Sequence, residues 1–98
     1  MRRAPKVDAN QSAIVSALRR VGCEVLSLAA VGNGCPDLLV FVPVTDRLVM
    51  LECKDGMKAP SRRSLTPHQR EFHKRWPVVV VEDENAALTA VGLVGISE

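Results

Sequence analysis

The spacing of hydrophobic residues changes along the chain, and the first part of the pattern predicts a helix. Apolar residues recur at intervals of three and four between Ile14 and Val21, so they would share one face of a helix. Asp8 or Asn10 is suited to cap the start of this helix, and Gly22 is suited to end it.

The next stretch predicts three β-strands. Residues 24–28 alternate between polar and apolar positions, as a half-buried strand does. Residues 38–42 and 48–51 are two apolar runs separated by a short turn-forming segment, which predicts two strands joined by a tight reversal. A loop over residues 31–34, rich in glycine, separates the first strand from this hairpin.

A second helix is signalled most clearly at its start. Thr66 is placed as the N-cap, Pro67 as the first helical residue, and Gln69 as the partner that completes a capping box. Phe72 and Trp76 form the predicted buried stripe of this helix. We therefore expect Trp76 to belong to the core rather than to serve as a base-stacking platform.

The last part of the chain predicts one more strand and one more helix. Residues 78–81 are four consecutive valines, which predicts a strand buried on both faces. Asp83 is suited to cap a short helix over residues 84–91. The predicted order is αβββαβα, an α/β fold with a mixed sheet flanked by helices, and no repeat or linker divides residues 1–98 into more than a single domain.

Composition and charge add an expectation about partners. The chain has 98 residues, 47% of them hydrophobic, which supports a compact protein with a limited core, and we expect it to form a dimer. Residues 54–75 include seven basic and two acidic residues. Such a segment is suited to a polyanion, although a solvated helix face would show the same pattern. The residues expected to contact DNA are Lys58, Arg62, Arg63, Arg70, His73 and Lys74.

The cysteines and the N-terminal segment indicate in which cellular compartment the protein works. Cys23, Cys35 and Cys53 are widely separated, with no C-x-x-C pair and no histidine at zinc-ligand spacing, so we expect neither a structural zinc nor a disulfide scaffold. No apolar stretch approaches the roughly 20 residues needed to span a bilayer, and no signal segment follows the N-terminus. We expect a reduced, soluble, cytoplasmic protein with no membrane contact.

Two carboxylates and one ammonium group are predicted to meet on the hairpin. Side chains alternate faces along a strand, so Glu52 and Lys54 point the same way and Cys53 points oppositely. A reversal centred near Thr45 places Asp37 opposite Glu52 or its neighbour. Such a group can hold a hard divalent cation beside a phosphate. The alternatives are a turn aspartate, an exposed strand glutamate and a surface lysine.

These residues resemble a known family of nucleases. The motifs that carry the resemblance are Gly34-Cys35-Pro36-Asp37, Glu52-Cys53-Lys54 and Gln69. They are similar to those of the PD-(D/E)XK nuclease superfamily, and more narrowly of the virus-type replication-repair nuclease (VRR-Nuc) domain. The resemblance covers the first helix through Val81. It implies a restriction-endonuclease-like αβββαβ core, a phosphodiesterase dependent on Mg²⁺ or Mn²⁺, and a phage or bacterial homodimer that resembles Holliday-junction resolvases in DNA recombination and repair.

The chemistry of the motifs gives each residue an expected role. Asp37 and Glu52 would ligate the metal, with the backbone carbonyl of Cys53 as a further oxygen ligand. Lys54 would position the attacking water or stabilise the pentacovalent phosphorus. Gln69 is a catalytic candidate, but the capping box alone would also account for it.

Two further positions support the site or depart from the family pattern. Gly34 is expected to permit a close backbone approach just before Asp37. Many family members carry a first-helix glutamate that faces the metal, whereas this chain offers Asn10 and Gln11 there, and Gln11 is the preferred match. An amide brings no negative charge, which puts a second metal position in doubt.

Three functions therefore remain open from the sequence. The first is a metal-dependent endonuclease that cuts branched DNA such as Holliday junctions. The second is a module that keeps the nuclease fold and binds DNA structures without cutting them, and the third is a small structural or assembly protein.

Overall fold

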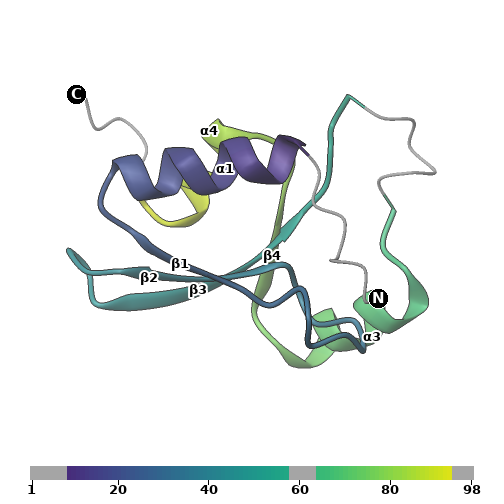
Figure 1. The fold of residues 1–98 in the computed structure, drawn as a ribbon. Coiled ribbons are helices and arrows are strands. Elements are labelled where there is room, and N and C mark those ends of the chain that lie inside the picture. The colour runs from purple at the N-terminus through teal and green to yellow at the C-terminus, as the bar shows by residue number, and fades with distance from the viewer. Residues whose placement is uncertain (1–8, 58–63, 94–98) are drawn as a thin grey trace, which may run out of the picture.

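The computed structural model describes residues 9–57 and 64–93, which form one four-stranded sheet with helices packed against it (Figure 1). The predicted element order and the α/β class are confirmed. The elements are α1 (Ala9–Arg20), β1 (Glu24–Ser27), β2 (Leu38–Val42), β3 (Arg47–Cys53), α3 (Pro67–Arg75), β4 (Val78–Val81) and α4 (Glu84–Ala90).

The sheet is mixed, with the strand order β1-β2-β3-β4. β1 is antiparallel to β2 and β2 is antiparallel to β3, whereas β4 runs parallel to β3. In the hairpin Leu38 pairs with Leu51, and the register continues to Val42 opposite Arg47. The tight reversal predicted between the two apolar runs is therefore confirmed.

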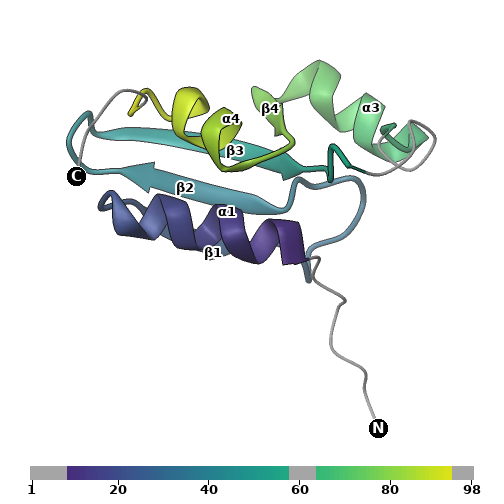
Figure 2. The ribbon, with the colours of Figure 1, turned by 90° about the horizontal axis from the view of Figure 1, so that it is seen from above.

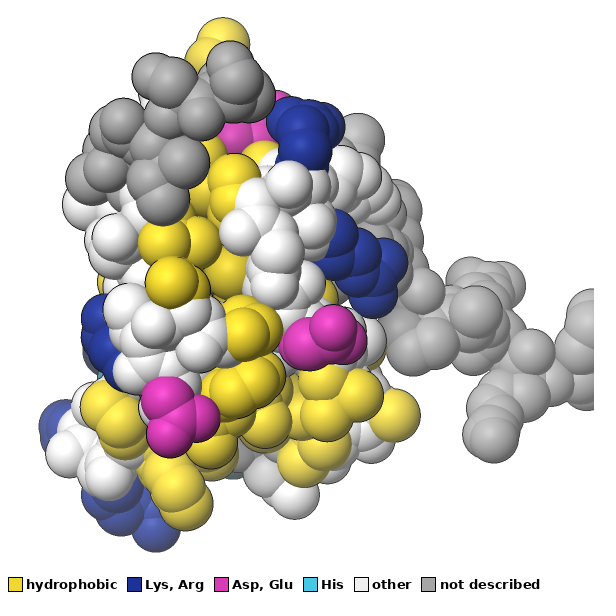
Figure 3. Space-filling view, turned by 90° about the vertical axis from the view of Figure 1, so that its left-hand side faces the viewer, with side chains coloured by type: hydrophobic (Ala, Val, Ile, Leu, Met, Phe, Trp, Pro, Cys, Tyr) yellow, Lys and Arg dark blue, Asp and Glu magenta, His cyan; other side chains and the backbone are white. Residues whose placement is uncertain are grey.

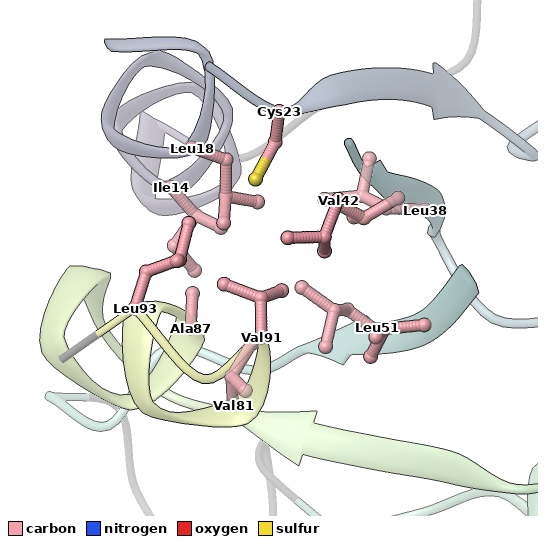
Figure 4. Packing of buried hydrophobic residues seen from close by; sticks show 12 residues of the cluster. Ile14, Leu18, Cys23, Leu38, Val42, Leu51, Val81, Ala87, Val91 and Leu93 are labelled. Carbon is pink, nitrogen blue, oxygen red and sulfur yellow. The ribbon is translucent and has the colours of Figure 1, made fainter. Parts of the chain in front are cut away.

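Helices α1 and α4 lie side by side on one face of the sheet (Figures 1 and 2). The core fills the space between these helices and the inward side chains of the strands (Figure 4). Leu18 of α1, Val91 after α4 and Leu51 of β3 are all fully buried in it. Because burial of an aliphatic side chain contributes about 1.5–3 kcal/mol, this inner layer is the main source of stability that the described residues show.

Two helices begin with the predicted caps. Thr66 and Gln69 form a complete capping box at the start of α3, with Pro67 in the first turn. At the start of α4 the Asp83 side chain accepts a hydrogen bond from the amide of Ala86. Both caps satisfy helical N–H groups that would otherwise lack a partner.

The four valines of β4 do not form a strand buried on both faces, so that prediction is wrong. Only Val81 is buried, whereas Val79 and Val80 are exposed. β4 is an edge strand that pairs with β3 alone. Among the described residues no helix covers its outer face, and Val81 alone enters the core cluster.

The predicted buried stripe of the second helix is also wrong. No residue of α3 is buried, Phe72 is half-buried, and Trp76 just after the helix is 51% exposed. The reason is that α3 lies beyond the end of the sheet, away from the layer that α1 and α4 form (Figures 1 and 2).

The outer face of the sheet carries apolar side chains that no described helix covers. Leu26 and Leu48 are 59% and 67% exposed, and together with Leu39 and Phe41 they line a hollow on this face. Figure 3, which views the molecule from the side of the β2–β3 turn, shows hydrophobic side chains at the surface there. At the turn itself Val44 is exposed as well.

The longest helix among the described residues is α1, with 12 residues. Neither it nor any other helix in this part of the chain is long and apolar enough to cross a membrane.

Candidate active site

The hairpin register brings Asp37 and Glu52 together at the end of the sheet. Leu38 pairs with Leu51, so the residues just before and just after them, Asp37 and Glu52, are opposite each other and point to the outer face. One oxygen of Asp37, Oδ2, accepts a hydrogen bond of 2.7 Å from the Cys53 amide. This bond fixes the Asp37 carboxylate beside β3.

Glu52 is the one charged side chain buried among the described residues, with 2% exposed. Its Oε2 accepts a hydrogen bond of 3.1 Å from Nε2 of Gln69 and lies 3.7 Å from Nζ of Lys54. Its other oxygen, Oε1, is buried with no hydrogen-bond donor among these residues. A buried polar atom normally has a partner. Oε1 of Glu52 therefore calls for a ligand, as does Nε2 of His73, which is also buried without a hydrogen-bond partner among the described residues.

The surroundings of Glu52 favour its neutral form when no cation is bound. Burial, and next the charge of the Asp37 carboxylate, raise the pKa of Glu52 from 4.5 to about 8, while Lys54 acts in the opposite direction. Two carboxylates this close repel each other when both are ionised, so either one of them holds a proton or a cation offsets their charges. The pair therefore has the electrostatics of a cation-binding site.

Gln69 connects the helix cap to the site. Its side-chain Oε1 accepts hydrogen bonds from the Thr66 amide at 2.9 Å and from Nζ of Lys54 at 3.2 Å. Its Nε2 donates to Glu52. The capping role and the site role of Gln69 are therefore not alternatives, because one amide group performs both.

Gly34 allows the loop before Asp37 to touch the start of α3. The backbone of Gly34 has a φ of +80°, and a Cβ built on it would collide with the backbone carbonyl of His68 and crowd the amide of Gln69. A glycine is needed here for both reasons. This contact holds the Gln69 end of α3 against the loop that carries Asp37.

Lys54 is enclosed at the same end of the sheet. Its side chain is 14% exposed, its amide bonds to the Val81 carbonyl at 2.9 Å, and its carbonyl accepts a hydrogen bond of 3.0 Å from Nδ2 of Asn10. On α3, burial and the charge of Lys54 lower the pKa of His73, so this imidazole lies near Lys54 in its neutral form.

The two carboxylates fit a hard divalent cation. Among the described residues no group of three or more His, Cys, Asp or Glu side chains is arranged around a metal position. Mg²⁺, however, is commonly held by one or two carboxylates and keeps several waters. The unsatisfied Oε1 of Glu52 beside Asp37 matches that mode of binding.

A solved structure described as a VRR_NUC domain is similar to this chain. The two structures agree with a TM-score of 0.62 and 27% sequence identity, over 83% of this chain and 88% of the other. The resemblance to the VRR-Nuc domain is thereby confirmed. The VRR-Nuc fold implies a nuclease of the PD-(D/E)XK type, a class that generally uses divalent metals and acts on DNA. No protein-family model and no curated protein match the chain.

Two predicted DNA contacts on α3 have partners within the chain, and their contact with DNA stays a prediction. Arg70 donates to the Leu65 carbonyl at 2.8 Å, and Lys74 pairs with Glu71 at 3.8 Å on the surface of α3. The predicted DNA contacts Lys58, Arg62 and Arg63, and the possible cap Asp8, lie outside the described residues.

Two residues at this candidate site have a place that the sequence did not predict: Asn10 lies inside α1 (Ala9–Arg20) rather than at its cap, and Cys35 had no predicted role. Asn10, rather than its neighbour Gln11, makes the hydrogen bond that ties α1 to the end of β3, whereas Gln11 is half-buried in α1. Burial and the charges of Glu52 and Asp37 raise the pKa of Cys35, which places this thiol near the carboxylates. For Cys35 the signal was its position two residues before Asp37.

Replacing Glu52 with glutamine should remove a pH dependence of folding stability. Because the pKa of Glu52 is higher in the folded chain than its ordinary 4.5, the folded state binds more protons between pH 4.5 and about 8. Its contribution to stability is full below pH 4.5 and is lost as the pH rises through about 8. In EDTA at pH 8, Glu52→Gln protein should be more stable than the wild type by on the order of 4 kcal/mol, because a shift of one pKa unit corresponds to about 1.4 kcal/mol.

Urea unfolding followed by circular dichroism at several pH values measures this difference. Adding Mg²⁺ at pH 8 should stabilise the wild type and leave Glu52→Gln protein unchanged. If the free energy of unfolding changed with pH in the same way in both proteins, the raised pKa of the buried Glu52 would be contradicted.

Gly34 and Gly32 offer a matched pair of substitutions. Both glycines have positive φ, but a Cβ on Gly32 meets no atom within 4 Å, whereas one on Gly34 meets the backbone of His68. Alanine should strain the backbone equally at both positions. Gly34→Ala should therefore cost about 1–3 kcal/mol more stability than Gly32→Ala, as measured by thermal unfolding. Equal losses would show that the loop and α3 are not in tight contact.

Proposed function

We propose that this chain is a metal-dependent endonuclease that hydrolyses phosphodiester bonds in branched DNA, with Holliday junctions as the first candidate. The observation that carries the proposal is the buried Glu52 with one unsatisfied oxygen beside the Asp37 carboxylate. No packing requirement of the fold explains such a pair, because a buried carboxylate is costly unless it is compensated.

In this proposal Asp37 and Glu52 hold one Mg²⁺ or Mn²⁺ ion, and the Cys53 carbonyl is a further oxygen ligand. When bound, such an ion makes a water more acidic and polarises the scissile phosphate. The Cys53 amide and the Gln69 side chain each donate to one carboxylate oxygen, so Oε1 of Glu52 and Oδ1 of Asp37 would be the oxygens that ligate the cation.

Lys54 supplies the positive charge that the protein itself contributes. Its ammonium group is held by Gln69 and lies near Glu52. We propose that it orients the attacking water or stabilises the charge that develops on the phosphate oxygens. Gln69 acts as the residue that keeps Lys54 and Glu52 in place, and Gln11 has a supporting position on α1.

DNA is also the substrate that the charges favour. Arg70, His73 and Lys74 are on α3, the helix that carries Gln69, and Lys58, Arg62 and Arg63 precede it in the sequence. These side chains would neutralise DNA phosphates. We propose, on the basis of the family resemblance, that this activity serves a phage or bacterial recombination or repair pathway inside the cell.

Cleavage of labelled DNA tests the proposal. Four-way-junction, flap and duplex DNA are incubated with the wild type in Mg²⁺, Mn²⁺ or EDTA. We expect metal-dependent cutting, with junction DNA preferred, and a loss of ~10²–10³-fold in Asp37→Asn and Glu52→Gln proteins because each removes one fixed charge from the site.

Asp46→Asn is the matched control for Asp37→Asn. Asp46 is an exposed carboxylate at the opposite end of the hairpin, in the β2–β3 turn. Its substitution should leave the cutting rate unchanged. Cutting that persists in Asp37→Asn protein, or an equal loss in the control, would overturn the assignment.

A second function has one observation in its favour. Asn10 and Gln11 occupy the part of the first helix where a carboxylate was expected, and among the described residues no third acidic side chain joins Asp37 and Glu52. A chain that binds junction DNA equally well in EDTA and in Mg²⁺, and cuts in neither Mg²⁺ nor Mn²⁺, would be a DNA-structure-binding module with a degenerate site.

We also propose that two copies associate through the outer face of the sheet. One domain offers one site, and paired cuts in a symmetric junction need two sites related by a two-fold axis. Leu26 and Leu48 expose apolar surface on the same sheet face that carries Asp37 and Glu52. Joining this face to a second copy would remove that surface from water and put two sites into one assembly.

Light scattering at micromolar concentration measures the association. We expect a dimer for the wild type and a monomer for Leu48→Glu protein, because a charge in the middle of an apolar interface is costly. Val44→Glu is the control, since Val44 is exposed at the hairpin turn rather than on the sheet face. A wild type that is monomeric with and without DNA would refute this arrangement.

A further inference from the structure

The aromatic side chains at the end of α3 form an exposed stack. The rings of Phe72 and Trp76 are 5.5 Å apart between centroids and 15° from parallel. Trp76 is 51% exposed, and no residue of α3 is buried. About half of the indole remains in contact with water and neither ring belongs to the core cluster, so core packing does not explain this pair.

This stack lies on the side of α3 that faces the candidate active site. Gln69 bonds to Glu52 and Lys54, and Trp76 follows it by seven residues, which is close to two full turns of a helix. The amide of Trp76 still bonds to the Phe72 carbonyl at 3.0 Å, as in a helix. The Trp76 backbone is therefore displaced by about 10 Å along the helix axis from Gln69, or about three base rises of one DNA strand.

The charges around the stack favour a nucleic acid over an apolar protein surface. The last turn of α3 contains His73, Lys74 and Arg75, and Lys74 and Arg75 are exposed. One acidic residue, Glu71, pairs with Lys74 at 3.8 Å between two well-exposed side chains, and such surface pairs are weak. Cations beside an exposed aromatic ring are the combination that binds unpaired bases and their phosphates.

We propose that Trp76, supported from behind by Phe72, is a stacking platform for an unpaired base of the DNA bound at the active site. This inference rests on the proposed function in that DNA is the ligand. It adds a specificity element, because paired bases in an intact duplex do not offer a free face to the indole, whereas single strands and the open bases of a branch point do. Lys74 and Arg75 contact the phosphates next to that base.

The sequence provides a direct probe of this platform. Trp76 is the only tryptophan of the chain and there is no tyrosine, so tryptophan emission reports on this position alone. The titration is carried out in EDTA with oligodeoxythymidylate, with duplex DNA of equal length and with a forked duplex. We expect saturable quenching by the single strand and the fork, and much weaker quenching by the blunt duplex.

Binding of labelled DNA, measured by fluorescence anisotropy, tests the energetic role of the platform. Trp76→Ala should weaken binding of single-stranded and forked DNA by about 5- to 150-fold, the range for loss of one base–aromatic stack. Trp76→Phe should lose much less, because a ring remains. The slope of affinity against salt should stay unchanged in both, whereas Lys74→Ala should reduce it by about one.

Val44→Ala, which removes another exposed apolar side chain at a distance from α3, is the matched control and should bind as the wild type does. Circular dichroism and a melting curve show whether Trp76→Ala protein is folded. If that variant is not folded, the quenching experiment on the wild type decides alone.

The outcomes separate this inference from the proposed function. Tight DNA binding without quenching, with Trp76→Ala binding as the wild type does, would overturn the platform and leave the nuclease proposal intact. No DNA binding at low salt would overturn both. Emission that changes with protein concentration alone, and not with DNA, would show that a second copy covers Trp76 and would overturn the platform.

Discussion

The carboxylate of Glu52 is buried at the end of β3, and the residues around it compensate the cost of burying its charge. Glu52 is almost inaccessible to water and lies beside a second carboxylate, Asp37. Burying a charge without compensation is one of the costliest features a fold can carry. The Gln69 amide, the Lys54 ammonium group and the tight Gly34 contact that holds α3 in place all supply or support that compensation.

The two faces of the sheet have different tasks. The inner face packs against α1 and α4 and contains the core that stabilises the described residues. The outer face carries Asp37 and Glu52 at one end and the exposed Leu26 and Leu48 further along. The candidate site and the exposed leucines thus lie on the face opposite the core. In the proposed assembly this outer face is available to DNA and to a second copy.

The correct sequence predictions depend on local interactions, and the wrong ones depend on coverage by distant elements. The capping box of Thr66 and Gln69 and the hairpin that opposes Asp37 to Glu52 involve neighbours in the chain or one short turn. Burial of Trp76, Val79 and Val80 required other elements to cover these side chains, and among the described residues none covers them fully. The hydrophobicity of a residue indicates how much burial would stabilise it, but it does not predict whether another element of the fold covers it.

The order of the elements, the caps of α3 and α4 and the hairpin could be predicted from the sequence, because strand alternation and turn chemistry are local rules. The hairpin prediction placed Asp37 opposite Glu52 or its neighbour, and the structure selects Glu52. Only the tertiary structure decided that Gln69 reaches both Glu52 and Lys54, and that Asn10 rather than Gln11 bonds to the end of β3. These contacts join residues up to 44 positions apart. Their geometry follows from how helices pack on a sheet, which no short-range pattern encodes.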